Sequence, residues 1–215
     1  MNLLNFSIME PKFMWILDNG HGTDTPGKRS PLLDDGQQLP EYAFNRDVVR
    51  RLMAMMESSG LCFHQLVPEE EDIPLGVRVE RANQLKSSLP LRFVSIHANA
   101  FGQEWNSAGG VETYCFRRGT QSETLAGIFQ HYLAGTTGWR NRGVKEAAFY
   151  VLKYTRMPAI LTENGFYTNR GECLKMFLPA WRERIALAHL RAIRLAELAA
   201  EDPNTTIVET IKRKK

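Results

Sequence analysis

His21 lies just past the end of an apolar stretch, residues 13–17, which is followed by Asp18-Asn19-Gly20. Such a stretch, bounded by turn residues, is typical of a buried strand. In an open α/β sheet, ligands bind at the carboxyl ends of the strands, so His21 would stand at the mouth of a site. Gly20 and Gly22 would let the backbone turn sharply and leave the imidazole unobstructed. A turn histidine bonded to the backbone would show the same pattern.

Three further side chains occupy comparable positions. His97 follows the strand expected over residues 91–96, Glu163 follows one expected over 159–162, and Glu41 lies in the first turn of a predicted helix. Two histidines and a glutamate are a standard ligand set for catalytic zinc, which keeps a fourth position for a water of pKa about 7. A carboxylate that is not bound to the metal can take the proton of that water and pass it to a leaving amine. The four residues are therefore the parts needed for metal-assisted hydrolysis of an amide, and their shared position at strand ends, rather than their spacing, predicts that they converge.

Strand-like and helix-like stretches alternate along the chain, which indicates an α/β fold. Strands are expected at residues 13–17, 61–67, 91–96, 111–116, 149–152 and 159–162, and helices at residues 39–57, 75–86, 121–133 and 181–200.

Several polar side chains on these elements are predicted to be structural. Arg78 and Arg81 would point outward from the helix at 75–86, and His64 lies inside a strand rather than at its end. His131 falls in the last turn expected for the helix at 121–133, where a cation favours the helix dipole. His189 lies within the long final helix, at its surface or in the core.

The composition is that of a globular protein with one core. The chain has 215 residues, of which 43% are apolar and 24% charged, and a net charge of +3. This mildly basic balance is weak evidence for a nucleic-acid partner, and none is expected. Cys62, Cys115 and Cys173 are far apart and lack CxxC spacing, so we expect reduced core residues rather than a disulfide or a zinc-thiolate set.

Five motifs occur in a defined order: Asp18-Asn19-Gly20-His21-Gly22, Glu41 at a helix start, Val94-Ser95-Ile96-His97-Ala98-Asn99, Asn141-Arg142-Gly143-Val144-Lys145 and Leu161-Thr162-Glu163-Asn164-Gly165-Phe166. Together they resemble the zinc-dependent N-acetylmuramoyl-L-alanine amidases of the type 3 family. The resemblance covers about residues 13 to 200.

The resemblance implies a site, a reaction and a fold. It makes His21, Glu41 and His97 the zinc ligands and Glu163 the catalytic glutamate. The family cleaves the amide between the lactyl group of N-acetylmuramic acid and the L-alanine of the peptidoglycan stem peptide. Its fold is a single domain with a twisted, mostly parallel sheet, here with six strands, and helices on both faces.

The chain departs from the family pattern in its first motif. Asn19 and Thr23 stand where the family has proline and glycine, which changes the loop rather than the histidine. The stretch 23–38, rich in Gly, Pro, Asp, Lys and Ser, is expected to form a substrate-contacting rim. The segment 117–141 has room for one ordinary helix, so we expect no inhibitory helix over the metal and no activator protein.

Four residues beside these motifs are candidates for supporting roles. Arg142 and Lys145 would contact stem-peptide carboxylates or help to polarise the scissile carbonyl. A solvated loop is an equally good explanation of both. Asn99 and Asn164 would orient ligands, and Asn99 is also a candidate substrate contact.

The ends of the chain complete the expected organisation. We expect an N-terminal extension at 1–12, the catalytic domain at 13–202 and a basic tail at 203–215, in which 205–211 could add an edge strand. The first residues lack a basic region and a cleavage site, and nothing later is long enough to span a bilayer. These features predict a protein that is held in the cytoplasm until release to the cell wall.

The leading hypothesis is therefore an endolysin-like or autolytic amidase that acts in cell lysis, with peptidoglycan as its partner. Two alternatives stay open: a catalytically inactive wall-binding protein on the same fold, and a zinc peptidase that acts on ordinary peptides.

Overall fold

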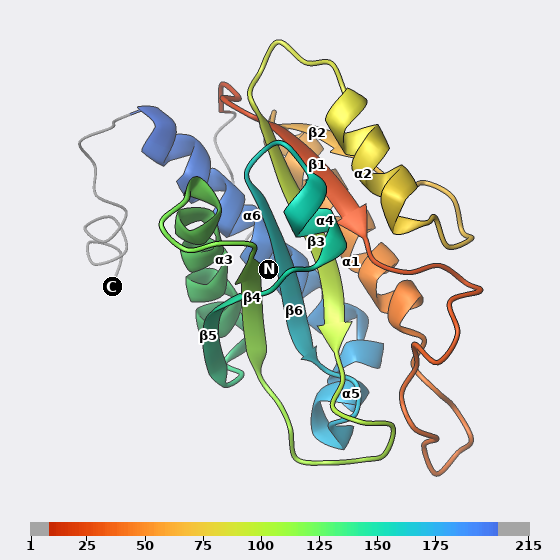
Figure 1. Ribbon diagram of the computed structural model, residues 1–215. Coiled ribbons are helices and arrows are strands. Elements are labelled where there is room, and N and C mark those ends of the chain that lie inside the picture. The colour runs from red at the N-terminus through yellow and green to blue at the C-terminus, as the bar shows by residue number, and fades with distance from the viewer. Residues whose placement is uncertain (1–8, 202–215) are drawn as a thin grey trace.

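The structure is a computed structural model that describes residues 9–201, and its centre is one six-stranded sheet (Figure 1). The strands are β1 Met14–Asn19, β2 Cys62–Gln65, β3 Leu91–Asn99, β4 Val111–Cys115, β5 Asn141–Glu146 and β6 Ala159–Phe166. Their order is β2-β1-β3-β6-β4-β5, and each neighbouring pair is parallel except β4 with β6. The predicted six-stranded, mostly parallel sheet is confirmed.

Helices cover both faces of the sheet, as predicted. They are α1 Glu41–Ser58, α2 Leu75–Gln84, α3 Gln121–Thr137, α4 Tyr150–Tyr154, α5 Arg170–Phe177 and α6 Pro179–Glu201. Because neighbouring residues of a strand face opposite ways, Trp15 packs into the core under α1, α3 and α6, whereas Ile16 packs under α2 and α4. Each face of the sheet is thus covered by its own apolar core.

The strand expected over residues 149–152 is wrong. Phe149 precedes the short helix α4 and the other three residues lie in it, where Val151 and Leu152 are buried while Tyr150 stays exposed. A short apolar run suits a helix segment or a strand equally well, so its pattern did not separate the two. The missing strand is β5, whose polar sequence pairs at the edge of the sheet with β4.

Two expectations about polar side chains are also wrong. Arg78 is 1% exposed rather than at the surface, whereas Arg81 is half-buried and pairs with Glu69 at 2.7 Å. His131 does not lie in a last turn, because α3 continues to Thr137 and ends at Gly138 in the left-handed conformation.

Other sequence predictions agree with the described residues. Cys62, Cys115 and Cys173 are free, and the last two are buried. His189 lies in the core, bonded to Thr162 and to the carbonyl of Ile185. Across residues 9–201, none of the helices combines the length and the apolar character that crossing a membrane requires. Most of the expected N-terminal extension and all of the basic tail fall outside the described residues.

Candidate metal centre

The register of the sheet lines up five side chains on one face. Asp18 of β1 is the partner of Ser95 on β3, and His97, two residues further on, is the partner of Glu163 on β6. Glu163 is in turn opposite Glu112 on β4. Partners in a register point to the same face, so these side chains form two short rows at the carboxyl ends of the strands, on the α2 and α4 face.

His21 enters the site from the loop after β1 in an unusual backbone conformation. Its φ angle is +66°, and it is the only non-glycine residue with positive φ among residues 9–201. The left-handed region costs a residue with a Cβ about 1–2 kcal/mol. The flanking hydrogen bonds hold this conformation, from Gly22 N to Thr25 Oγ1 at 2.9 Å and from Thr23 N to the carbonyl of Glu70 at 2.8 Å.

The two glycines beside His21 are needed for close approach rather than for a turn. A Cβ on Gly20 would lie 2.0 Å from Cε1 of His97, and one on Gly22 would lie 2.1 Å from the backbone nitrogen of Asp72. Neither glycine has a positive φ. The expected sharp turn is therefore made by His21 itself, and Gly20 gives space to the imidazole of His97.

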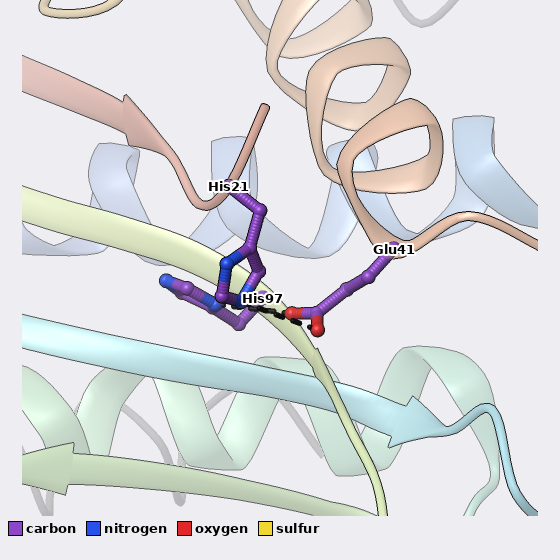
Figure 2. A group of neighbouring side chains, drawn as sticks. All are labelled: His21, Glu41 and His97. Atoms are coloured by element: carbon purple, nitrogen blue, oxygen red, sulfur yellow. Dashed lines mark hydrogen bonds and ion pairs between the residues drawn. The ribbon is translucent and has the colours of Figure 1, made fainter. Parts of the chain in front are cut away.

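Glu41 joins the two histidines into one cluster (Figure 2). It is the first residue of α1 and 1% exposed. Its Oε2 lies 3.3 Å from His21 Nε2, and its Oε1 lies 3.0 Å from His97 Nδ1. The two rings are perpendicular, with centroids 5.0 Å apart, so their nitrogen edges converge on the carboxylate.

The three side chains fit a zinc ion by donor type and by distance. One donor atom from each residue lies within 4.8 Å of the other two. Zinc bonds of 2.0–2.2 Å at tetrahedral angles separate ligand atoms by roughly 3.4 Å, so only small shifts would be needed to bind the ion. Two imidazoles and one carboxylate also leave a fourth position open, as in catalytic rather than structural sites. Among the described residues, only this group of histidine, cysteine and acidic side chains is close enough to hold a metal.

The ionisable side chains of the cluster shift one another's pKa values. Burial raises the pKa of Glu41, but the hydrogen bonds and charges of His21 and His97 outweigh burial and hold that pKa far below its usual range. Burial lowers the pKa of His97, but Glu41 outweighs it and raises that pKa. Glu41 is therefore ionised and can serve as an anionic ligand.

Glu163 is the acidic residue of the site that lacks a partner. Its Oε2 is buried and forms no hydrogen bond to a described residue. Burial raises the pKa of Glu163 to about 8. Together with His21 and His97 it lines a cavity of about 440 Å³, whose outer wall includes Leu75 and Tyr150. A carboxyl group of this kind, open to the cavity and next to the metal cluster, can exchange a proton with a ligand there.

Glu112, which sequence analysis did not single out, gathers the expected substrate-binding residues beside Glu163. Its carboxylate accepts hydrogen bonds from Arg142 Nε at 2.6 Å, from Asn99 Nδ2 at 2.7 Å and from Lys145 Nζ. Burial raises the pKa of Glu112, but the hydrogen bonds from Lys145, Tyr114 and Arg142 outweigh burial and lower that pKa to about 2. Because Glu112 stands in a short strand without any motif, only the register with Glu163 reveals it.

The two asparagines have different surroundings. Asn164 Nδ2 donates to the carbonyl of His97 at 2.9 Å, so it holds the strand that carries this ligand. Asn99 does not bond to His21, Glu41 or His97, because its amide is directed to Glu112. The expectation that Asn99 orients a metal ligand is therefore wrong, whereas its place beside Arg142 suits a substrate contact.

A comparison with protein-family models matches residues 16–195 to the N-acetylmuramoyl-L-alanine amidase family. The fold and the site define an α/β protein with a candidate metal site, and the chain belongs to this amidase family.

Individual relatives agree with this assignment. The chain is 34% identical over 175 residues to N-acetylmuramoyl-L-alanine amidase LytC of Bacillus subtilis, which covers 80% of the chain and 33% of LytC. It therefore spans about a third of the length of that relative. It is also 30% identical to the endolysin of Bacillus phage SPP1, over 85% of the chain and 65% of the endolysin. Among solved structures, an N-acetylmuramoyl-L-alanine amidase from Clostridium difficile 630 superposes with a TM-score of 0.76 at 27% identity, over 88% of the chain and 98% of that structure.

Substituting Gly20 tests the close contact between the His21 loop and His97. We expect Gly20→Ala to weaken zinc binding by roughly tenfold or more, because the new methyl group displaces the His97 ring. Gly127→Ala is the matched control, since nothing lies within 4 Å of its added Cβ in α3. Chelator competition measures both affinities. Equal zinc affinity in Gly20→Ala and the wild type would show that a methyl group at residue 20 does not displace the His97 ring.

The raised pKa of Glu163 predicts a pH dependence of stability in the metal-free protein. Between an ordinary glutamate pKa of about 4.3 and the folded value of about 8, the folded state holds a proton that the unfolded chain has lost. Stability therefore falls as pH rises through this window, by at most about 1.4 kcal/mol per pH unit for one proton. His97 adds a loss in the same direction above about pH 6.5, because its pKa is also raised.

Urea unfolding of the chelator-treated protein between about pH 5 and pH 8 measures this slope. We expect Glu163→Gln to flatten it, whereas Glu80→Gln, at an exposed position of α2, should keep it. A wild-type slope in Glu163→Gln would show that the folded state does not retain the Glu163 proton.

Proposed function

We propose that the chain is a zinc-dependent N-acetylmuramoyl-L-alanine amidase that hydrolyses the amide between N-acetylmuramic acid and the L-alanine of the stem peptide. The observation that carries the proposal is the cluster of His21, Glu41 and His97 next to the unpartnered carboxyl of Glu163, in a chain of this family. The named amidase relatives supply the substrate class.

His21, Glu41 and His97 would hold the zinc ion. When bound, zinc supplies a Lewis acid for the scissile carbonyl and lowers the pKa of a water molecule to about 7. The three side chains carry one negative charge in total when both imidazoles are neutral, so the loaded site keeps a net positive charge that polarises the carbonyl.

Glu163 would move the proton. As a carboxylate it takes a proton from the attacking water, and as a carboxylic acid it passes that proton to the departing nitrogen of L-alanine. Its burial favours the protonated form, while a cation in the neighbouring cluster would favour the ionised form. Burial and a bound cation would therefore shift the pKa of Glu163 in opposite directions.

The stem peptide would lie over β4 and β5. Glu112 compensates one of the two positive charges of Arg142 and Lys145, which leaves one positive charge beside Glu163. The guanidinium of Arg142 is also stacked over the Phe166 ring, 4.9 Å from its centroid, which fixes its plane. Arg142 and Lys145 are thus positioned to meet a carboxylate of the stem peptide, with Asn99 as a further donor.

A role in cell lysis without an activator protein completes the proposal. The segment between β4 and β5 forms α3, which packs with α6 on the sheet face opposite the cavity. This placement supports direct access of peptidoglycan to the site. The likeness to a phage endolysin supports the lytic role. Retention in the cytoplasm until release to the wall stays a prediction that cell fractionation can test.

Replacing the proposed proton carrier separates this enzyme from an inactive binding protein. We expect Glu163→Gln to lower the cleavage rate of purified peptidoglycan by roughly 10²–10⁴-fold while zinc binding persists, because glutamine cannot carry the proton. Glu80→Gln should cleave at the wild-type rate. Mass spectrometry of the wild-type digest should show free peptides that begin with L-alanine and intact glycan strands.

Two results would contradict the proposal. Full activity of Glu163→Gln would exclude the assigned proton transfer. Products cut within the peptide or within the glycan would exclude the assigned bond.

A further inference from the structure

Arg78 is a deeply buried cation beside the site, and its guanidinium is paired with the carboxyl group of Asp18. Its Nη1 donates to Asp18 Oδ1 at 2.6 Å and to the carbonyl of Asn19 at 2.9 Å. Its Nη2 donates to Asp72 Oδ1 at 2.9 Å, and its Nε to the carbonyl of Ile73 at 2.7 Å. A guanidinium is always charged and only donates, so Asp18 faces it as an acceptor.

The second oxygen of Asp18 fixes the hydroxyl of Ser95. Ser95 Oγ lies 2.6 Å from Asp18 Oδ2, and both residues are at most 1% exposed. The serine hydroxyl is the donor in this contact, so the hydrogen between the two oxygens is that of Ser95. Ser95 therefore donates its only hydrogen to Asp18 and is left with lone pairs.

These lone pairs face the imidazole of His97. Ser95 Oγ lies 3.1 Å from His97 Nε2. Since the hydroxyl hydrogen is already committed to Asp18, the ring nitrogen must be the donor in this contact. A neutral imidazole carries one hydrogen, so a hydrogen on Nε2 leaves the lone pair on Nδ1. Nδ1 is the atom that lies 3.0 Å from Glu41 Oε1, at the metal position.

We propose that the chain of contacts Arg78–Asp18–Ser95, here called the serine relay, sets the tautomer of His97 so that Nδ1 offers its lone pair to the metal. The relay makes Ser95 and Asp18 positioning residues for the metal ligand. This inference rests on the proposed function only for the identity of the metal as zinc.

The relay opposes a competing tautomer. With its hydrogen on Nδ1, His97 would donate to Glu41 Oε1 and close the metal position with an internal hydrogen bond. It would then leave Ser95 Oγ without a donor inside the protein, which carries the cost of a buried unsatisfied acceptor. The buried Asp18 and Arg78 thus favour the arrangement that keeps Nδ1 free for a ligand.

Ser95→Ala tests the relay through two readouts that need no peptidoglycan. The first is the zinc dissociation constant from chelator competition, which we expect to rise by about 10–100-fold. The second is the set of ¹⁵N shifts of the His97 ring in the metal-free protein, at a pH well above its pKa. The share of His97 that carries its hydrogen on Nε2 should be larger in the wild type than in Ser95→Ala, because Glu41 Oε1 competes for a hydrogen on Nδ1 in both proteins.

Matched variants separate the relay from a general loss of stability. Thr113→Val removes another buried hydroxyl of the same sheet, one that donates to Gln130 Oε1 at 2.9 Å, and should leave zinc affinity and tautomer unchanged. Ser95→Thr keeps the hydroxyl and should restore the Nε2 tautomer.

Two results would overturn the proposal: wild-type zinc affinity with an unchanged share of the Nε2 tautomer in Ser95→Ala, or a zinc-loaded wild-type protein in which His97 binds the ion through Nε2. The second result needs no variant to fold. A protein that binds zinc with the Nε2 tautomer but fails to cleave peptidoglycan would support the relay and contradict the proposed function.

Discussion

The site depends on a carboxylate that has been taken out of water. Glu41 is almost fully buried, and an isolated buried charge costs several kcal/mol. Two imidazoles compensate this charge, and Asn45 Nδ2 and the backbone nitrogen of Ala98 each donate to Oε1 at 3.3 Å. Its position at the start of α1 adds the favourable field of a helix N-terminus. The segments of the protein around Glu41 are folded so that these groups reach its carboxylate.

Two local features follow from that constraint. His21 reaches Glu41 only from a strained, left-handed backbone, and the bonds on either side of it offset the strain. His97 reaches Glu41 only because Gly20 has no side chain. Packing therefore requires the two glycines of the first motif. Gly20 makes room for the imidazole ring of His97, and Gly22 makes room for the backbone of Asp72.

The same sheet edge gives different environments to neighbouring acidic side chains. Asp18 is neutralised by Arg78, Glu41 by two histidines and Glu112 by Arg142 and Lys145. Glu163, which lies between His97 and Glu112 in the register, has no ion pair with a described residue. Perturbed carboxyl groups of this kind gather at sites that transfer protons. The three ion-paired carboxylates are thus distinguished from Glu163, the proposed proton carrier, by their partners and not by their depth.

The sequence predicted the parts of this arrangement that depend on strand ends. His21, His97 and Glu163 each follow an apolar run, and Glu41 follows Pro40, so local patterns were sufficient to place them. Arg78 and Glu112 could not be found this way, because each owes its role to a partner distant in the chain. The sequence of β5 is polar, so its pattern did not indicate the edge strand that it forms. The apolar residues of α4 have the pattern of a strand, although they form a helix.

Anomalous diffraction at the zinc edge, from crystals of the zinc-loaded protein, tests the central claim most directly. We predict one strong anomalous peak, which marks a zinc ion bonded to His21, Glu41 and His97 Nδ1, with Glu163 close to the ion but not bonded to it. A peak elsewhere, or bonds to His97 through Nε2, would contradict this account of the site.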